Sequence, residues 1–204
     1  MRRMTGLVVV SAAVEGIVDE AVVRKLIVQA GGRPGTVYGK NGKPFLRRQI
    51  HGYNNAARRL PWMVLVDLDR DAECAPPLCE EWVPDPALYL CFRVAVREVE
   101  AWLMADAESL ASFLSVARSR IAADPEQLFE PKTEMINLAR HSRRREIRKD
   151  MVPRERSGRQ VGPAYASRLM EYVETKWRPE VAAQAAESLR RAIDCLRRLI
   201  QEPA

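Results

Sequence analysis

The spacing of apolar positions in the first half of the chain switches between two periods. Short, continuous apolar runs predict buried strands over 7–13, 36–38, 62–66 and 88–95. Between them, apolar residues recur at helical spacing over 18–30 and, more weakly, over 44–60. Strands that alternate with helices predict an α/β fold, with a mainly parallel, doubly wound sheet flanked by helices on both faces.

The second half of the chain has helical spacing almost throughout and no obvious strand. Four helices are expected, over 96–114, 131–148, 163–177 and 179–199. Prolines stand at places where these helices would begin or end. The sequence therefore predicts two parts, an α/β domain over residues 1–105 and an all-helical C-terminal extension over residues 106–204 that packs on it.

The compartment can be inferred from apolar segments and cysteines. No apolar run approaches the roughly 20 residues that a membrane span needs. Arg2 and Arg3 before an apolar run imitate a secretory signal, but cleavage near Ala13 would remove the first predicted strand. We therefore expect a cytoplasmic protein without a membrane partner.

The four cysteines are Cys74, Cys79, Cys91 and Cys195. They lack the paired C-x-x-C spacing of a zinc site, so reduced thiols are the simpler interpretation. Cys91 lies in an apolar run and is expected in the core, whereas Cys195 lies in a predicted helix and is expected to pack there.

Basic residues concentrate in one segment. The formal net charge of the chain is +6, and residues 140–159 contain nine basic and three acidic side chains, which matches that excess. Such a surface suits phosphate backbones, so we expect a nucleic acid, most readily DNA, as partner. A solvated face or a docking site for an acidic protein are the alternatives. The candidate nucleic-acid-binding residues are Lys40, Lys43, Arg143, Arg144, Arg145, Arg148 and Lys149.

Carboxylates follow two of the predicted strands. Glu15 follows the first strand, and Asp67, Asp69 and Asp71 follow the third. Carboxyl ends of neighbouring parallel strands meet at one sheet edge, and clustered carboxylates favour a hard divalent cation such as Mg²⁺ or Mn²⁺. The alternative is a solvated strand end, with Glu15 capping the next helix.

Glu98 and Glu100 fall inside the helix predicted over 96–114. A helix turns by about 100° per residue, so the two side chains should point to nearly opposite sides. Glu100 lies beside the apolar stripe and is expected to point inward, where a buried ion pair with Arg93 or Arg97 is the alternative to a functional role. Glu98 is expected on a solvated face.

The order strand, Val14-Glu15-Gly16, helix, strand, helix, strand, Asp67-Leu68-Asp69 resembles the TOPRIM superfamily over residues 6–105. The remainder resembles the bacterial domain-of-unknown-function family 4276. The motifs that carry this second resemblance are Arg97-Glu98-Val99-Glu100-Ala101-Trp102-Leu103, Asp124-Pro125-Glu126, Pro131-Lys132 and Val161-Gly162-Pro163-x-Tyr165.

The TOPRIM resemblance implies roles for several residues. Glu15 would be an acid/base group or a ligand, and Asp67 with Asp69 would bind magnesium. By comparison with overcoming-lysogenisation-defect (OLD) nucleases, Glu100 would hold a second metal and Lys132 would stabilise charge on the transferring phosphate. For Lys132, an ordinary surface position at a helix start is the alternative.

Together these observations predict a magnesium-dependent TOPRIM-type nuclease that acts on phosphodiester bonds in a bacterial antiphage or mobile-element defence system. OLD nucleases carry an ATPase on the same chain, and no Walker pattern occurs here, so a separately encoded ATPase is the expected partner. The alternative is a non-catalytic module that binds nucleic acid or a partner on a TOPRIM scaffold.

Overall fold

The structure, a computed structural model, describes residues 6–201. The described chain forms two compact units that interleave along the sequence. Unit 1 contains residues 6–66, 76–94 and 191–201, and unit 2 contains residues 67–75 and 95–190. The predicted division into residues 1–105 and 106–204 stays a prediction about domain organisation.

Unit 1 is built on a four-stranded, all-parallel sheet, so the predicted α/β fold is confirmed. Its strands are β1 (Val9–Val14), β2 (Arg33–Gly39), β3 (Trp62–Asp67) and β4 (Leu90–Ala95). The strand order is β2-β1-β3-β4, so the order reverses beside β1. In doubly wound sheets, ligands bind outside the carboxyl ends of the strands at such a reversal.

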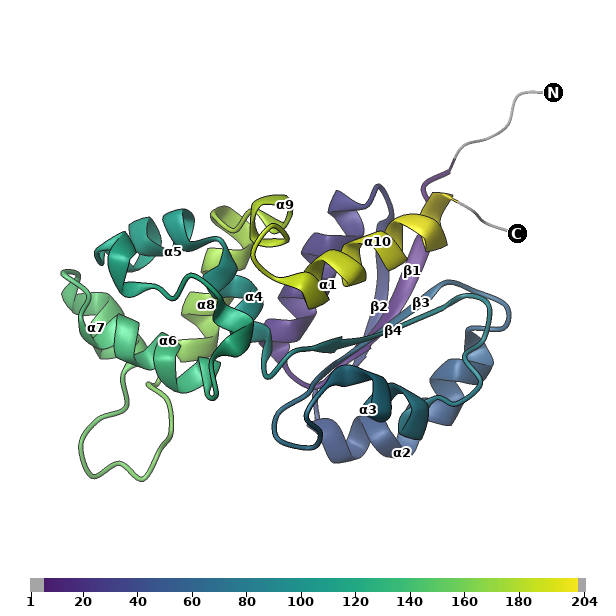
Figure 1. Ribbon diagram of the computed structural model, residues 1–204, viewed down its shortest axis with the longest axis horizontal. Helices are drawn as coiled ribbons and strands as arrows, with labels where there is room; N and C mark the ends of the chain where they lie inside the picture. The colour runs from purple at the N-terminus through teal and green to yellow at the C-terminus, as the bar shows by residue number, and fades with distance from the viewer. Residues whose placement is uncertain (1–5, 202–204) are drawn as a thin grey trace. The chain divides into compact units, whose positions relative to one another are not determined.

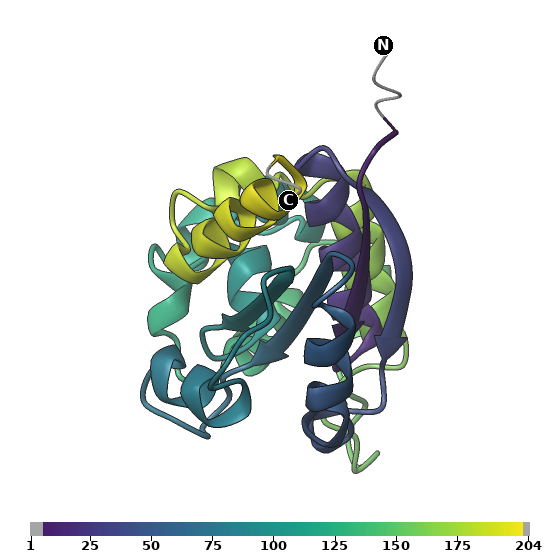
Figure 2. The same cartoon turned by 90° about the vertical axis from the view of Figure 1, so that its right-hand side faces the viewer.

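Helices cover both faces of this sheet. They are α1 (Ile17–Gln29), α2 (Lys43–Ala56), α3 (Ala75–Trp82) and α10 (Glu187–Gln201). Figures 1 and 2 show α1 and the C-terminal part of α10 on one face, and α2 and α3 on the other. Because both faces are covered, the central strands β1 and β3 are apolar nearly throughout, and most of their residues are buried.

Glycine is required where β2 ends. Gly39 has a φ of +88°, and a Cβ at this position would lie 2.2 Å from the carbonyl oxygen of Val14. The chain can therefore turn tightly against the end of β1, where the amide of Lys40 donates to the same carbonyl at 2.8 Å.

Unit 2 is helical. Its elements before α10 are α4 (Val99–Ala105), α5 (Ala107–Leu114), η1 (Arg118–Arg120), η2 (Pro125–Gln127), α6 (Pro131–Arg140), α7 (Arg145–Met151), α8 (Tyr165–Thr175) and α9 (Pro179–Ala182). Every residue of α4 is buried, and this helix contacts α5, α6, α9 and η2. A helix that is apolar nearly all round belongs in the centre of its unit, and α4 is the core of unit 2.

Three helices that the sequence predicts as single are each divided in two. The helix over 96–114 is interrupted at Asp106, whose backbone leaves the helical region at ψ 66°. Asp106 is fully buried, and its carboxylate pairs with Arg178 at 2.7 Å and accepts the amide of Ser109 at 3.4 Å. A side chain that caps a new helix and holds a distant arginine explains the break.

The other two divisions occur at turns. The helix predicted over 131–148 is interrupted at residues 141–144, and the helix predicted over 179–199 separates into α9 and α10. None of the helices within the described range is both long and apolar enough to cross a membrane.

Candidate active site

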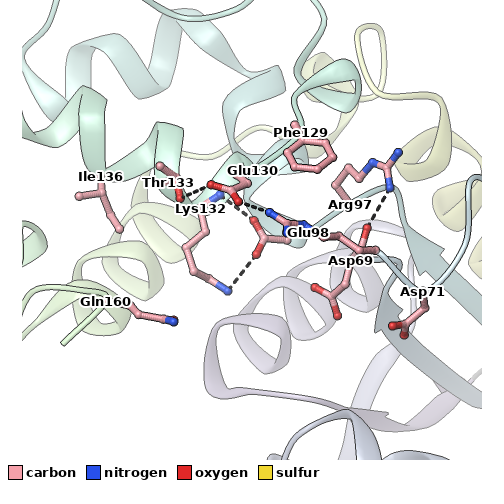
Figure 3. Close-up of a pocket in the computed structure, with 11 residues that line it drawn as sticks. Asp69, Asp71, Arg97, Glu98, Phe129, Glu130, Lys132, Thr133, Ile136 and Gln160 are labelled. Carbon is pink, nitrogen blue, oxygen red and sulfur yellow. Dashed lines mark hydrogen bonds and ion pairs between the residues drawn. The ribbon is translucent and has the colours of Figure 1, made fainter. Parts of the chain in front are cut away.

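A pocket with a volume of about 560 Å³ lies in unit 2. It is lined mainly by charged residues. They are Asp69, Arg70, Asp71, Arg97, Glu98, Phe129, Glu130, Lys132, Thr133, Ile136 and Gln160. Figure 3 shows these side chains and the contact between Lys132 and Glu98. Three predicted site residues, Asp69, Asp71 and Lys132, thus line the same pocket.

Lys132 is the centre of a carboxylate–lysine cluster, which we define as Asp67, Glu98, Glu100, Lys132 and Tyr165. The Lys132 Nζ atom lies 3.3 Å from Glu98 Oε1 and 3.8 Å from Glu100 Oε1. Tyr165 donates its hydroxyl to Glu100 Oε1 at 3.1 Å. The cluster joins α4, α6 and α8 with the residue that ends β3.

The charges in this cluster fix the protonation of Lys132. Burial lowers its pKa, but the charges of Glu100, Glu98 and Asp67 together outweigh burial and raise the pKa above its ordinary value. Lys132 therefore stays protonated at neutral pH, as a positive charge and hydrogen-bond donor and not as a general base.

Tyr165 is also held in one protonation state. Burial and the nearby charge of Glu100 raise the pKa of its phenol well above the ordinary value. The phenol therefore remains a donor to the Glu100 carboxylate, whose side chain is only 3% exposed. A buried carboxylate with a hydrogen-bond donor and a cation beside it is held in a defined position.

The expectation that Glu98 and Glu100 point to opposite sides is wrong. Glu98 is the N-cap of α4 and has an extended backbone, with φ −144° and ψ 155°, so helical geometry begins only at Val99. Both carboxylates reach Lys132 as a result. An ion pair of Glu100 with Arg93 or Arg97 was the alternative to a functional role, and the structure describes contacts of Glu100 with Lys132 and Tyr165.

Two carboxylates of the cluster also hold helix N-termini. Glu98 Oε2 accepts the backbone amide of Lys132 at 2.7 Å, in the first turn of α6. Asp67 Oδ1 accepts the amide of Val99 at 2.9 Å, at the first residue of α4. Carboxylates are favourable at these positive helix ends, so local secondary structure orients the acidic groups.

The backbone beside the cluster is strained. Asp69 and Arg97 both have left-handed conformations, with φ of 50° and 62°. The Asp69 amide donates to the Arg97 carbonyl at 2.7 Å, and the Arg97 guanidinium donates to the Asp69 carbonyl at 3.0 Å. Such conformations cost on the order of 1 kcal/mol each and cluster at functional sites. This observation motivates a functional interpretation of the pocket.

Asp71 and the stacked pair of Arg70 and Phe129 lie at the rim of the pocket. Asp71 is exposed, and its amide donates to the Leu68 carbonyl in the turn after β3. Phe129 is 64% exposed, and the Arg70 guanidinium lies 4.5 Å from its ring centroid. Arg70 also pairs with Glu130. An exposed aromatic ring with a stacked arginine is a surface on which a flat group can stack.

The remaining predicted residues of the first half belong to unit 1. Glu15 directly follows β1, and its carbonyl accepts the amide of Gly42 at 3.0 Å. Lys40 pairs with Glu20 at 2.9 Å, and Lys43 is the first residue of α2. The joint metal site of Glu15 with Asp67 and Asp69 stays a prediction.

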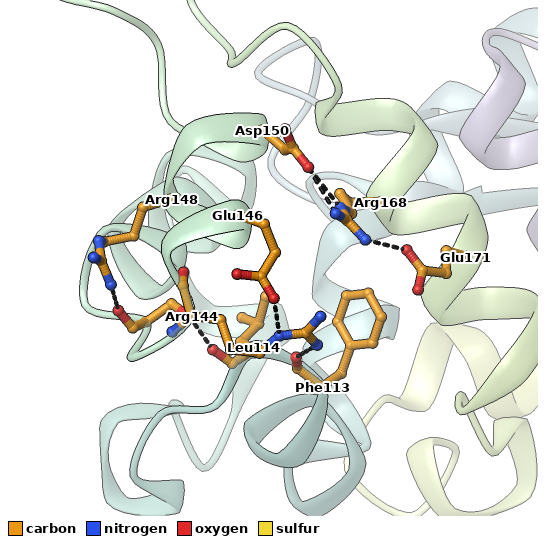
Figure 4. Close-up of polar contacts among 9 residues, drawn as sticks. Phe113, Leu114, Arg144, Glu146, Arg148, Asp150, Arg168 and Glu171 are labelled. Atoms are coloured by element: carbon orange, nitrogen blue, oxygen red, sulfur yellow. Dashed lines mark hydrogen bonds and ion pairs between the residues drawn. The ribbon is translucent and has the colours of Figure 1, made fainter.

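The basic residues around α7 separate into two groups. Arg144 donates to Glu146 at 2.8 Å and to the Phe113 carbonyl at 3.4 Å, and Arg148 donates to the Ser142 carbonyl. Figure 4 shows the contacts of Arg144 and Arg148, together with the pair of Arg168 and Asp150. These two arginines hold the turn before α7 in place.

Arg143, Arg145 and Lys149 form the second group. All three are exposed, and none has an ion-pair partner within residues 6–201. The sequence predicts one helix that would carry all of these charges. In the structure, α7 begins only at Arg145, so Arg143 and Arg144 precede the helix.

Magnesium is the cofactor that the sequence predicts. The described residues contain no group of three or more His, Cys, Asp or Glu side chains arranged to hold a metal ion. Magnesium requires fewer protein ligands, because it keeps several waters and binds through one or two carboxylates and substrate phosphates. Asp67 and Asp69 supply that type of donor, so the residues present fit this ion.

Sequence reasoning did not assign roles to Tyr165 and Phe129, and it placed Glu98 outside the site. Tyr165 contacts a residue 65 positions away, which no local pattern reveals. It does fall in the Val161-Gly162-Pro163-x-Tyr165 motif, which was a usable signal. For Glu98, the error came from the predicted helix start at residue 96, because α4 begins only at Val99.

Comparison with known proteins adds no assignment. No family model, curated protein or solved structure matches this chain. The resemblance to the TOPRIM superfamily and to domain-of-unknown-function family 4276 therefore stays a prediction, and the functional argument rests on the site itself.

Proposed function

We propose that the protein is a magnesium-dependent nuclease that hydrolyses phosphodiester bonds at the pocket beside Lys132. The observation that carries the proposal is the carboxylate–lysine cluster, in which a protonated lysine and oriented carboxylates converge beside an open pocket. Phosphodiester hydrolysis needs these groups, because charge develops on phosphate oxygens in the transition state.

The residues at this site have separate chemical tasks in this proposal. Asp67 and Asp69 would hold the metal ion, with Glu100 as a further candidate ligand. When bound, magnesium or manganese would activate a water molecule and neutralise charge on the phosphate. Lys132 would donate to a nonbridging phosphate oxygen, while Glu98 and Glu100 keep its ammonium in place.

Substrate binding would use the surface around the pocket. The ring of Phe129 and the guanidinium of Arg70 offer a stacking surface for a nucleobase at the pocket rim. Arg143, Arg145 and Lys149 would contribute contacts to phosphates that do not depend on sequence. Because stacking requires an unpaired base, single-stranded nucleic acid is the favoured substrate in this proposal.

The same cluster also supports a second candidate, a non-catalytic module that binds nucleic acid or a protein partner. In that case, the contacts of Lys132 with Glu98 and Glu100 would serve only to join α4 and α6. A separately encoded ATPase in a bacterial defence system remains the proposed partner in either case, by analogy with OLD nucleases.

Cleavage of supercoiled plasmid and single-stranded DNA with Mg²⁺ or Mn²⁺ tests the proposal. Wild-type protein should cut, and the Asp67→Asn/Asp69→Asn variant should lose cutting by about a hundredfold or more. Asparagine preserves the oxygen that accepts the Val99 amide, so the fold should be retained. Asp85→Asn, at an exposed position whose side chain makes no hydrogen bond or ion pair with the described residues, is the matched control.

Salt-sensitive DNA binding without metal-dependent cutting, in both wild type and the double variant, would instead establish the binding module.

A further inference from the structure

A second pocket, in unit 1, places one thiol beside two arginines. Its volume is about 300 Å³. It is lined by Leu88, Tyr89, Leu90, Arg93, Cys195, Arg198 and Leu199. None of these residues belongs to the candidate active site, so this pocket calls for an explanation of its own.

Behind the pocket, Cys195 meets a second cysteine. Cys91 lies on β4 and is fully buried, whereas Cys195 lies on α10 and is half-buried at the pocket. Cys91 and Arg93 are two residues apart on β4, so they face the same side of the sheet, and Arg93 lines the pocket together with Cys195. The two thiols and the guanidinium of Arg93 are close enough to shift one another's pKa. The Nε atom of Arg93 is buried and has no hydrogen-bond partner within the described chain.

The surroundings distinguish the two sulfurs. The neighbouring Cys91 thiol lowers the pKa of Cys195, and the charges of Arg93 and Arg198 lower it further, against the opposing effect of burial. Burial raises the pKa of Cys91 well above its ordinary value. Cys195 is therefore the thiolate and faces the pocket, while Cys91 remains a thiol behind it.

We propose that Cys195 and Cys91 form a peroxide-oxidisable dithiol, in which Cys195 is the attacking sulfur and Cys91 the resolving one. The pocket admits the oxidant, the two arginines hold the thiolate, and the adjacent Cys91 thiol is positioned to complete a disulfide. This would fasten α10 covalently to β4 within unit 1, independently of the nuclease proposal.

The reaction takes place in two balanced steps. The Cys195 thiolate attacks one peroxide oxygen, and the O–O bond breaks, which gives a sulfenic acid and releases hydroxide or alkoxide. The Cys91 sulfur then attacks the Cys195 sulfur, and the S–O bond breaks. The Cys91 proton leaves with the displaced hydroxyl as water, so two electrons pass from the thiols to the peroxide.

Solvent accessibility alone predicts a different order of reactivity among the thiols. Cys74 is exposed and Cys195 is half-buried, so accessibility by itself would make Cys74 the faster thiol. At pH 6, ordinary thiols are almost entirely protonated, and a stabilised thiolate should react roughly tenfold faster. The titratable and charged groups near Cys195 are Cys91, Arg93 and Arg198, with Tyr89 also lining the pocket.

The first experiment is limited alkylation of the intact, reduced protein with iodoacetamide at pH 6, followed by peptide mass spectrometry. Cys195 should be modified roughly tenfold faster than Cys74, and Arg198→Gln should reduce that ratio severalfold. Modification of Cys74 first, with a ratio that Arg198→Gln leaves unchanged, would overturn the proposal.

The second experiment treats the intact protein with hydrogen peroxide and maps its cross-linked peptides. A Cys91–Cys195 disulfide is expected in wild type and in the Cys74→Ser control. Cys91→Ser should stop the reaction at the Cys195 sulfenic acid, which dimedone traps. Absence of the Cys91–Cys195 cross-link in wild type under conditions that oxidise Cys74 would overturn the proposal.

Discussion

Lys132 and Arg145 carry the same charge in different surroundings. Lys132 is held beside a pocket by the carboxylates of Glu98 and Glu100, the second of which is buried. Arg145 begins α7, is exposed, and has no ion-pair partner within the described residues. The first charge is fixed in position and suits transition-state stabilisation, whereas the second is exposed to solvent and suits general attraction of phosphates.

The basic segment itself shows why a count of charges is insufficient. Arg148 has the same residue type as Arg145 and lies on the same helix, yet its guanidinium is used to bind the Ser142 carbonyl. We therefore expect residues of the basic segment to differ in their effects on stability and on nucleic-acid binding.

The largest effect on stability is expected at the loop between α7 and α8, which carries Gln160 of the pocket. The Gly162 amide donates to the Met151 carbonyl at 3.0 Å, and a Cβ at Gly162 would lie 2.4 Å from the Asp150 carbonyl oxygen. Gly162→Ala should therefore lower the free energy of unfolding by about 2–3 kcal/mol, as measured by urea denaturation.

Gly158→Ala in the same loop is the matched control. A Cβ at Gly158 meets nothing within 4 Å, so only its positive φ of +66° opposes the substitution. The loss should be about 1 kcal/mol. Equal losses of unfolding free energy in Gly158→Ala and Gly162→Ala would show that the close approach of Gly162 to the Asp150 carbonyl does not affect stability.

A smaller loss is expected inside the cluster. Tyr165→Phe removes the hydroxyl that donates to the buried Glu100 carboxylate, and it should lower the free energy of unfolding by about 1–2 kcal/mol. Tyr53→Phe is the comparison, because the structure describes no hydrogen bond of its hydroxyl. Tyr53→Phe should change the free energy of unfolding by less than about 0.5 kcal/mol. An equally small effect of Tyr165→Phe would contradict the stabilising role of the hydrogen bond to Glu100.

The smallest stability effects are expected on α7. Arg148→Ala should cost about 1 kcal/mol, because it removes a hydrogen bond from a charged donor to the Ser142 carbonyl. Arg145→Ala should leave stability nearly unchanged, but it should reduce the slope of log affinity against log salt concentration by about 1. If both variants change the salt dependence of DNA binding equally, the separation into structural and available arginines is wrong.

The fold was predictable because its strands have a strong local signal. The run 62–66 is apolar without interruption, as expected for a strand covered on both faces, and it became β3. Helix boundaries were less predictable, because Asp106 ends α4 through contacts with Arg178, which lies 72 residues away. Periodicity alone contains no information about such a partner.

The candidate site was predictable only in part. Asp69, Asp71 and Lys132 were expected from strand ends and motifs, and they line the same pocket. The position of Glu98 depended on whether the helix began before or after it, and a shift of that boundary reversed the direction of its side chain. Helix boundaries are the least certain part of a sequence interpretation, and the wrong prediction for Glu98 follows from a misplaced helix start.

The central claim is that Lys132 acts on a phosphodiester substrate, and single-turnover cleavage of DNA in Mg²⁺ or Mn²⁺ by Lys132→Met and Lys132→Arg tests it most directly. Loss of the charge should slow cleavage by about a hundredfold or more, whereas arginine should retain part of the rate. DNA affinity and chain stability, measured in parallel, separate catalysis from binding and folding. Wild-type rates in a folded Lys132→Met variant would contradict the account.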